Sequence, residues 1–190
     1  MKNKIYNYIQ NSVDNYNRLL TDDDLQKSIE IIVEKSIEAF QLDKKMLLCG
    51  NGGSAADAQH IAAELSGRFY TDRLPLYAEA LHVNSSYMTA VANDYGYEET
   101  YSRMVEASGK KGDMLIGIST SGNSPNVIKA IKTAKAKGMF TIGFTGSSGG
   151  KMNTICDIII KIPSDDTPRI QEAHILIGHI ICQLIEEEMF

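Results

Sequence analysis

The stretch MLIGISTSGNSPNVIKAI, residues 114–131, has the composition of a buried strand, a polar turn and a helix in direct succession. Residues 114–118 are apolar without alternation, which is typical of a strand covered on both faces of a parallel sheet. Pro125 suits the first position of a helix, and Ser124 before it suits the N-cap. Four hydroxyl side chains surround this helix start: Ser119, Thr120, Ser121 and Ser124. The stretch therefore predicts a turn that can bind a dianion, such as a phosphate group, without a lysine.

The same alternation of strand and helix extends over residues 43–190. Apolar runs that predict strands occupy residues 46–49, 76–80, 114–119, 140–144 and 155–162, of which the run at 76–80 is the weakest. Helical patterns occupy residues 54–66, 85–91, 98–108, 125–137 and 168–188. Because uninterrupted apolar strands alternate with helices, the pattern predicts an α/β three-layer sandwich with a five-stranded parallel sheet and helices on both faces.

Two further turns that follow predicted strands are rich in glycine or hydroxyl side chains: Gly50-Asn51-Gly52-Gly53 and Thr145-Gly146-Ser147-Ser148. In open α/β sheets ligands bind at the carboxyl ends of the strands, so the three turns mark one edge of the sheet as the functional edge. The glycine spacing does not match the G-x-G-x-x-G fingerprint, and the turn at 118–125 lacks the lysine of a P-loop. Neither dinucleotide binding nor nucleotide hydrolysis is therefore predicted.

Residues 1–42 predict a pair of amphipathic helices in front of the α/β core. The segment Thr21-Asp22-Asp23-Asp24 between them is a helix-start signal, because acidic side chains are favoured near a helix N-terminus. At this length the chain is expected to form a single domain over residues 1–190, with 43–190 as its core.

Composition excludes several classes of protein. The 190 residues carry a net charge of −5 and no run of Lys or Arg, so no nucleic-acid partner is predicted. No window approaches the about 20 apolar residues of a membrane span, and the N-terminus lacks the apolar stretch of a signal peptide. Cys49, Cys156 and Cys182 lie in apolar runs without a disulfide framework. They predict buried, reduced thiols and a cytoplasmic protein.

Four motifs carry a resemblance to a known family: GNGGSAADAQHIAAEL, ANDYG, GISTSGNSPNVIKAI and RIQEAHILIGHIICQLIE. In this order and spacing they resemble the phosphoheptose isomerase branch of the SIS (sugar isomerase) family over most of the chain. The resemblance implies the SIS fold, which is flavodoxin-like. It further implies that a sugar phosphate is held by Ser119, Thr120, Ser121 and Ser124, and that the sugar is lined by Asn51, Gly52, Gly53, Asn93 and Asp94.

Two pairs of polar side chains could bind a metal ion. His60 and Glu64 lie four residues apart on one predicted helix, and Gln171 and His179 share a broad face of the last one. A His and a Glu at this spacing more often form an ordinary solvated pair, and the spacing does not choose between His174 and His179. The resemblance implies that His60, Glu64, Gln171 and His179 bind one zinc ion per subunit, and that Glu64 and Gln171 also contact the sugar.

The reaction that the resemblance implies is the conversion of D-sedoheptulose 7-phosphate to D-glycero-D-manno-heptose 7-phosphate through an enediol, the first step in making bacterial heptose precursors. Glu64 is expected to be the catalytic base and His179 its partner. Metal binding competes with both roles, because a ligand's lone pair is engaged. Two alternatives stay open: a non-catalytic SIS scaffold, and an isomerase of arabinose 5-phosphate or a hexose phosphate. Whether the heptose serves lipopolysaccharide, capsule or glycoprotein is left open.

The sequence also predicts that copies of this chain associate with one another. The N-terminal helices carry more apolar side chains than a peripheral pair needs: Ile5, Ile9, Ile29, Ile32, Val33 and Ile37. Together with the resemblance, this predicts a homotetramer in which these helices pack between subunits and the sites are shared.

The chain departs from some members of the family at one position. They carry an acidic residue directly before the Arg-Ile-Gln stretch, where this chain has Pro168. Asp165 and Asp166 are the nearest acidic side chains that could replace it.

Overall fold

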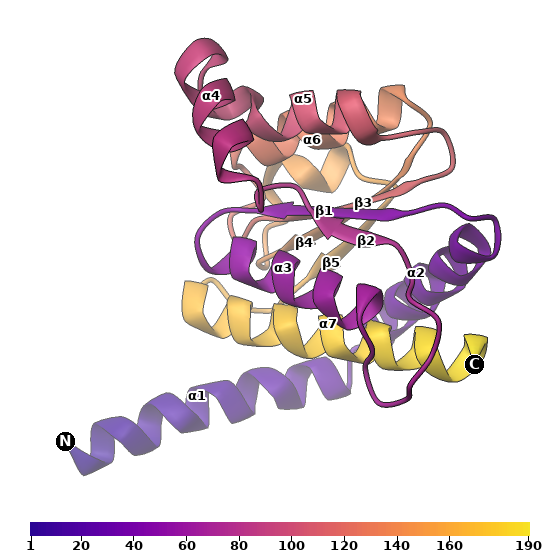
Figure 1. Cartoon of the computed structure of the whole chain (residues 1–190). Helices are drawn as coiled ribbons and strands as arrows, with labels where there is room; N and C mark the ends of the chain where they lie inside the picture. The colour runs from indigo at the N-terminus through magenta and orange to yellow at the C-terminus, as the bar shows by residue number, and fades with distance from the viewer.

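The computed structural model describes residues 1–190 as a three-layer α/β sandwich (Figure 1). Its five strands are all parallel and lie in the order β2-β1-β3-β4-β5. They are β1 Met46–Gly50, β2 Ala78–Ala80, β3 Met114–Ile118, β4 Phe140–Thr145 and β5 Ile158–Lys161. This is the flavodoxin-like strand order, so the predicted fold class is confirmed.

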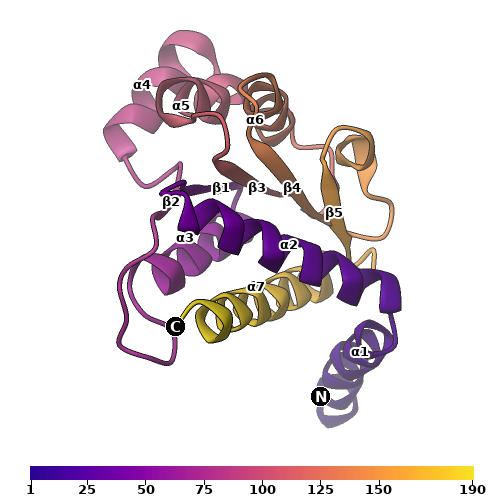
Figure 2. The same cartoon turned by 90° about the vertical axis from the view of Figure 1, so that its right-hand side faces the viewer.

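Seven α-helices and two short 3-10 helices accompany the sheet. They are α1 Lys2–Leu20, α2 Asp23–Gln41, α3 Gly53–Ser66, α4 Ser85–Tyr95, η1 Tyr97–Glu99, α5 Thr100–Ser108, α6 Pro125–Ala136, η2 Gly150–Thr154 and α7 Thr167–Met189. Helices α2, α3 and α7 cover one face of the sheet, and α4, α5 and α6 lie over the other (Figures 1 and 2). The larger hydrophobic core lies on the α2/α3/α7 side. None of these helices combines the length and the apolar character that crossing a membrane requires.

The central strands are buried along their whole length, which explains their uninterrupted apolar sequence. Every residue of β1 and β3 is buried. The register pairs Gly50 with Ile118 and Ile118 with Phe144, so β1, β3 and β4 end side by side. The three polar turns that follow these strands therefore meet at one edge of the sheet, as predicted.

The predicted strand at residues 155–162 is too long at its start. The strand begins at Ile158, because Ile155 and Cys156 belong to a turn whose N–H groups both donate to the carbonyl of Met152. Both side chains nevertheless pack against the smaller core, which makes this segment apolar without being a strand. Likewise the predicted strand at 76–80 pairs only from Ala78, at the edge of the sheet.

The predicted N-terminal helices form, but they have different roles. Asp22 caps α2 by accepting from the N–H of Leu25 at 2.9 Å. Ile29, Ile32 and Val33 of α2 are buried in the chain's own core. Helix α2 is thus a structural layer of the sandwich, and the role of residues 1–42 in assembly stays a prediction.

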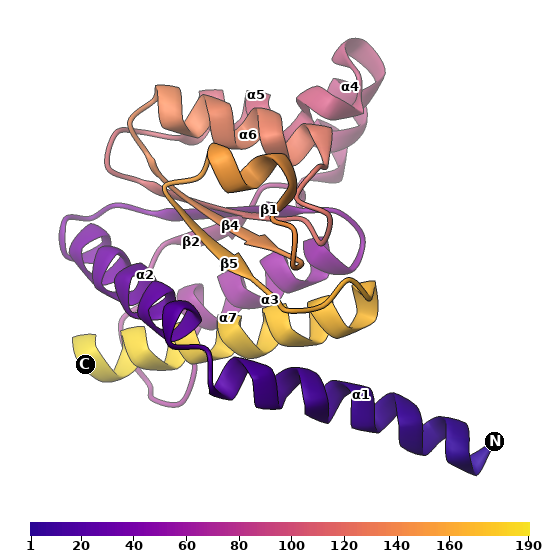
Figure 3. The ribbon, with the colours of Figure 1, turned by 180° about the vertical axis from the view of Figure 1, so that it is seen from behind.

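Helix α1, in contrast, runs along α7 and projects beyond it (Figure 3). The side chain of Arg169 on α7 donates to the carbonyl of Tyr8 at 2.9 Å and pairs with Glu172. Apolar side chains of α1 remain exposed along its length: Ile5, Tyr8, Ile9, Val13 and Leu20. Of the two N-terminal helices, α1 is therefore the one with exposed large apolar side chains.

Candidate active site

The turn after β3 gathers three serine hydroxyls. Ser119 is buried, and its Oγ lies 2.9 Å from Oγ of Ser124 and 3.4 Å from Oγ of Ser121. Ser124 is the N-cap residue of α6, as predicted, but its side chain makes no capping hydrogen bond and turns toward Ser119 instead. The positive end of α6 is thus left without a side-chain cap, which suits a site where an anion binds.

The turn after β4 supports the turn after β3. The N–H of Gly146 donates to the carbonyl of Thr120 at 2.9 Å, and the N–H of Met152 donates to that of Gly122 at 3.1 Å. Gly122 has φ +64°, and a Cβ there would lie 2.1 Å from the carbonyl oxygen of Gly149. Only glycine satisfies both constraints. The hydroxyl-rich turn is therefore held in a defined shape.

Asn51, which follows β1, is held by two residues that the sequence did not single out. Its amide exchanges two hydrogen bonds of 2.9 Å with the amide of Asn126, and its Oδ1 also accepts from the hydroxyl of Tyr97 at 3.0 Å. The N–H of Val127 donates to Oδ1 of Asn126, which fixes the orientation of both amides. The second N–H of Asn51 Nδ2 remains available to a ligand.

Helices α3 and α7 lie side by side and run parallel (Figure 1). At Gly53 an added Cβ would lie 2.5 Å from Nε2 of Gln171, and at Gly178 it would lie 2.6 Å from Cδ1 of Ile61. The absence of a Cβ at both glycines therefore lets the side chains of Gln171 and Ile61 pack directly against the backbone of the facing helix. Gly52, with φ +56°, is the residue at which the chain turns from β1 into α3.

This pairing of helices brings His60, Glu64 and His179 together. Nε2 of His60 lies 3.1 Å from Oε1 of Glu64 and 3.3 Å from Nε2 of His179. The ligand atoms of the three residues all lie within 4.8 Å of one another. The predicted i, i+4 pair on α3 is thus completed by a side chain from α7.

The three side chains have the chemistry of a divalent metal site. Two imidazole nitrogens and a carboxylate oxygen are ligands that Zn²⁺ accepts, and such a set leaves a position for a further ligand. Gln171 lies two helical turns before His179 and packs against Gly53 at the start of α3. The donors fit a bound metal, and the place of Gln171 in the ligand set stays a prediction.

Comparison with known proteins identifies the family. Residues 7–146 match the family model of the SIS domain. The phosphoheptose isomerase of Aneurinibacillus thermoaerophilus is 54% identical over 190 residues, which cover all of this chain and 96% of the relative. That of Clostridium acetobutylicum is 53% identical and is covered to 97%. The solved structure of phosphoheptose isomerase GmhA from Neisseria gonorrhoeae has a TM-score of 0.92 at 39% identity, over 98% of both chains.

The chain belongs to the phosphoheptose isomerase family. It is therefore an aldose–ketose isomerase built on a SIS domain, and both the fold and the resemblance predicted from sequence are confirmed.

In this isomerase the two histidines of α7 have different surroundings. His179 faces His60 and Glu64, whereas the His174 ring is completely buried and donates from Nε2 to the carbonyl of Thr145 at 3.1 Å. Burial lowers the pKa of His174 to about 4, against a smaller opposing effect of the Thr145 hydrogen bond. This geometry assigns His174 to packing and hydrogen bonding.

His174 predicts a loss of stability in mild acid. In the unfolded chain the His174 ring is protonated below its ordinary pKa of 6.5, whereas in the folded chain its pKa is lowered to about 4. The free energy of unfolding should therefore fall between these values, by about 2 kcal/mol from this group at pH 5, and stay constant above pH 6.5. Urea unfolding at pH 7 and pH 5, at one protein concentration, measures the change. His174→Gln should reduce it, and equal losses in both proteins would contradict the assignment.

Asn93 and Asp94 are exposed at the end of α4, where the Asn93 amide donates to the Asp94 carboxylate at 2.8 Å. Helix α4 lies over the opposite face of the sheet from α3 and α7 (Figure 2). Within one chain these two residues are therefore not brought to the group of His60, Glu64 and His179. Their contact with the sugar stays a prediction.

Two acidic residues lie close to Pro168, and only Asp165 contacts the turn after β4. Asp165 accepts a hydrogen bond from the hydroxyl of Ser147, and Asp166 is the N-cap residue of α7 without a side-chain capping bond. Asp165 is thus engaged in holding a neighbouring loop, and Asp166 is the freer of the two carboxylates.

Asp57 is a polar residue of the site region that sequence reasoning missed. It lies one helical turn before His60 on α3, and one of its carboxylate oxygens is buried without a hydrogen-bond partner. Burial raises its pKa to about 6, while the nearby His60 acts in the opposite direction. The i, i+3 spacing to His60 was the available signal.

Proposed function

We propose that this chain is a cytoplasmic D-sedoheptulose 7-phosphate isomerase that forms D-glycero-D-manno-heptose 7-phosphate. The observation that carries the proposal is the meeting of His60, Glu64 and His179 on two parallel helices, in a chain that is 54% identical to a phosphoheptose isomerase. A non-catalytic scaffold would have no use for this group. The product would enter the synthesis of heptose precursors.

In the proposed mechanism the hydroxyl-rich turn binds the phosphate and fixes the substrate. The hydroxyls of Ser119, Thr120, Ser121 and Ser124 and the N-terminus of α6 would donate hydrogen bonds to the dianion, and Asn51 would donate its free N–H to the sugar. Fixing the phosphate end places the carbonyl end of the extended sugar at a defined distance from the turn.

Proton transfer is assigned to Glu64 and His179. Glu64 would take the proton from C1, the C–H electron pair would form the C1=C2 bond, and the C2 oxygen would receive a proton from His179. In the second half Glu64 would return its proton to C2, and His179 would take the proton from the C1 oxygen as the aldehyde forms. A zinc ion held by His60, Glu64, His179 and Gln171 would supply positive charge that stabilises the enediolate oxygens. Because a lone pair on zinc cannot accept a proton, Glu64 and His179 would act as ligands and as proton carriers at different steps.

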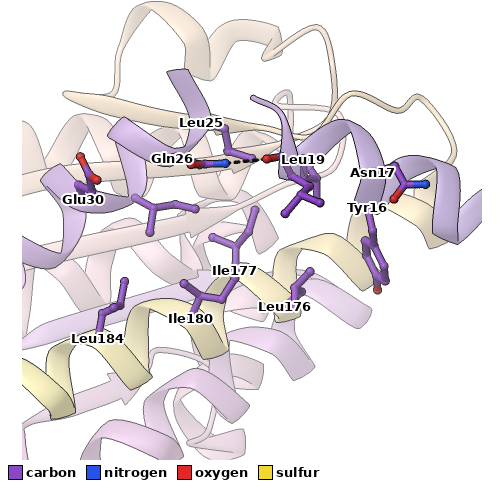
Figure 4. A pocket seen from close by; sticks show the side chains of 12 residues that line it. Tyr16, Asn17, Leu19, Leu25, Gln26, Glu30, Leu176, Ile177, Ile180 and Leu184 are labelled. Carbon is purple, nitrogen blue, oxygen red and sulfur yellow. Dashed lines mark hydrogen bonds between the residues drawn. The ribbon is translucent and has the colours of Figure 1, made fainter. Parts of the chain in front are cut away.

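The proposed assembly is a homotetramer with shared sites. Within one chain the serine turn leads into α6 on one face of the sheet, whereas His60 and His179 lie on helices over the other face. Contributions from more than one subunit would complete such a divided site. The exposed apolar side chains of α1, and an apolar groove of about 520 Å³ where α1 and α2 meet α7, support the proposal (Figure 4).

The groove is lined mainly by leucine and isoleucine side chains of three helices: Leu19, Leu20, Leu25, Ile177, Ile180 and Leu184. Burying such surface is the main driving force for stable subunit association.

Light scattering of the purified protein at micromolar concentration should report a mass of four subunits. The mass of a single subunit would contradict the proposed assembly.

A substrate panel tests the function. The purified protein is assayed with sedoheptulose 7-phosphate, arabinose 5-phosphate and fructose 6-phosphate, each with metal-stripped and zinc-supplemented enzyme. The heptulose phosphate should give the highest kcat/KM, and zinc should restore activity to stripped enzyme. A higher kcat/KM for arabinose 5-phosphate would show that the proposed substrate is wrong. Absence of turnover with all three sugar phosphates would favour a non-catalytic SIS scaffold.

Replacing Ser119 or Ser124 by Ala should weaken phosphate binding. Each change removes a hydroxyl from a charged acceptor, at a cost of about 1.5 to 3 kcal/mol. We expect a roughly 10- to 150-fold lower kcat/KM, chiefly through KM, because the phosphate is held alike in the ground state and the transition state. Steady-state kinetics measure the effect, with Ser28→Ala on α2 as the matched control. Kinetics like those of the control would mean that the phosphate binds elsewhere.

A further inference from the structure

The loop between α3 and β2 is anchored to α7 through one buried carboxylate. Glu186 accepts from the backbone N–H groups of Phe69, Tyr70 and Thr71 at 3.1, 2.8 and 2.8 Å, and from Nε of Arg73 at 2.9 Å. Its side chain is 4% exposed. Burial would raise the pKa of this carboxyl, but the three N–H groups and Arg73 together lower it to about 2. The carboxylate is therefore ionised at neutral pH and all its hydrogen bonds are charge-assisted.

Arg73 connects this carboxylate to the end of α3. Its Nη2 donates to the carbonyl of Glu64 at 2.9 Å, and its Nη1 donates to the carbonyl of Leu65 at 2.9 Å. Carbonyls in the last turn of a helix lack partners within the helix, so the guanidinium group caps α3. The Arg73 side chain is 2% exposed, and the ring of Phe190 lies 5.5 Å from its Cζ atom. The backbone that Arg73 holds is that of the proposed base itself.

Phe69 connects the same anchor to the proposed acid–base partner. Its backbone is held by Glu186, and its ring centroid lies 5.8 Å from that of His179. His60 lies against His179 as well, with the two ring centroids 4.9 Å apart. The ring of His179 is therefore confined by the anchored loop and by α3.

We infer that Glu186 and Arg73 are positioning residues that hold Glu64 and His179 in the relative orientation required for proton transfer and metal binding. This inference rests on the proposed function. It assigns a role to the Arg73–Glu186 ion pair, which takes no part in the proposed mechanism. The pair acts through the Glu64 backbone and the Phe69 ring, and neither residue touches the phosphate-binding turn. Its loss should therefore appear in kcat and in metal affinity, with KM unchanged.

The test is Glu186→Gln, which keeps the shape of the side chain and removes its charge. Co²⁺ is titrated into metal-stripped protein and followed by its visible absorption, and kcat and KM are measured with sedoheptulose 7-phosphate. We expect at least about tenfold weaker cobalt binding, an altered cobalt spectrum, a similar fall in kcat and an unchanged KM. Arg73→Lys should act in the same direction, because it removes the two donors to α3 and retains a positive charge.

Asp113→Asn is the matched control. Asp113 is as buried as Glu186, pairs with Lys45 at 3.0 Å and accepts from the backbone N–H groups of Lys45 and Lys110, but none of these partners belongs to α3 or α7. This variant should lose thermal stability and bind cobalt normally. If Glu186→Gln and Arg73→Lys behave like Asp113→Asn, the ion pair is only structural and the inference is wrong. Wild-type protein that binds cobalt without turning over the sugar would instead refute the proposed function, and the cobalt comparison would still decide the inference.

Discussion

Replacing Glu64 by Gln is expected to lower kcat at least ~100-fold, the lower end of the effect of a general base. Glutamine preserves the size of the side chain and its hydrogen-bonding reach to His60, which lies 3.1 Å away. It removes the basicity that the C1 proton requires. Glu64 is the only carboxylate among His60, Glu64 and His179, so no other residue of this group can replace it as the base.

Two measurements separate the roles that Glu64 could have. Exchange of the C1 proton with solvent reports proton abstraction, and the metal content of the purified variant reports ligation. A variant that retains its metal but loses exchange has lost the base. Exchange at the wild-type rate would show that the base is another residue. Glu34→Gln, an exposed change on α2, is the matched control and should leave exchange unchanged.

The layered fold could be predicted from sequence because burial on two faces leaves a clear pattern. In β1 and β3 every position is buried, so the apolar run has no gaps and cannot be mistaken for a surface strand. The start of β5 could not be predicted by the same rule. Ile155 and Cys156 are apolar because they pack on the smaller core from a turn, and apolar character does not distinguish the two backbone conformations.

The parts of the site that are local in sequence could be predicted from chemistry alone. Ser119 and Ser124 lie in one turn, and His60 and Glu64 lie one helical turn apart, so their proximity follows from local geometry. The choice of His179 over His174 could not be made in this way. It depends on which face of α7 packs against α3, and only the resemblance favoured His179, the histidine that lies against His60.

Contacts across the fold were beyond the reach of sequence patterns. In the sequence, Asn126 has no feature that distinguishes it from other residues in the first turn of a helix, and Tyr97 resembles a residue of a surface turn. In the structure, both form hydrogen bonds with the side-chain amide of Asn51. Glu186 reads as one of three consecutive glutamates at the end of α7. Its burial is determined by the loop that folds over it, and no periodicity reports that contact.

Replacing His179 by Gln is expected to abolish most turnover, whereas His174→Gln should leave most of it. His179 lies 3.3 Å from His60 and would lose both its proton-transfer and its ligand role. The His174 ring is buried beside Phe144 and bonds to a backbone carbonyl, so its replacement should reduce stability instead.

The two variants test whether the two faces of α7 are functionally distinct. kcat, cobalt binding and thermal stability are measured for both. His179→Gln should lose about 100-fold or more in kcat and bind cobalt weakly at nearly unchanged stability, since its ring lies at the edge of the core. His174→Gln should show the reverse combination. Equal losses of kcat in both variants would mean that α7 acts through its packing alone, because the contact with His60 is the feature that separates the two rings.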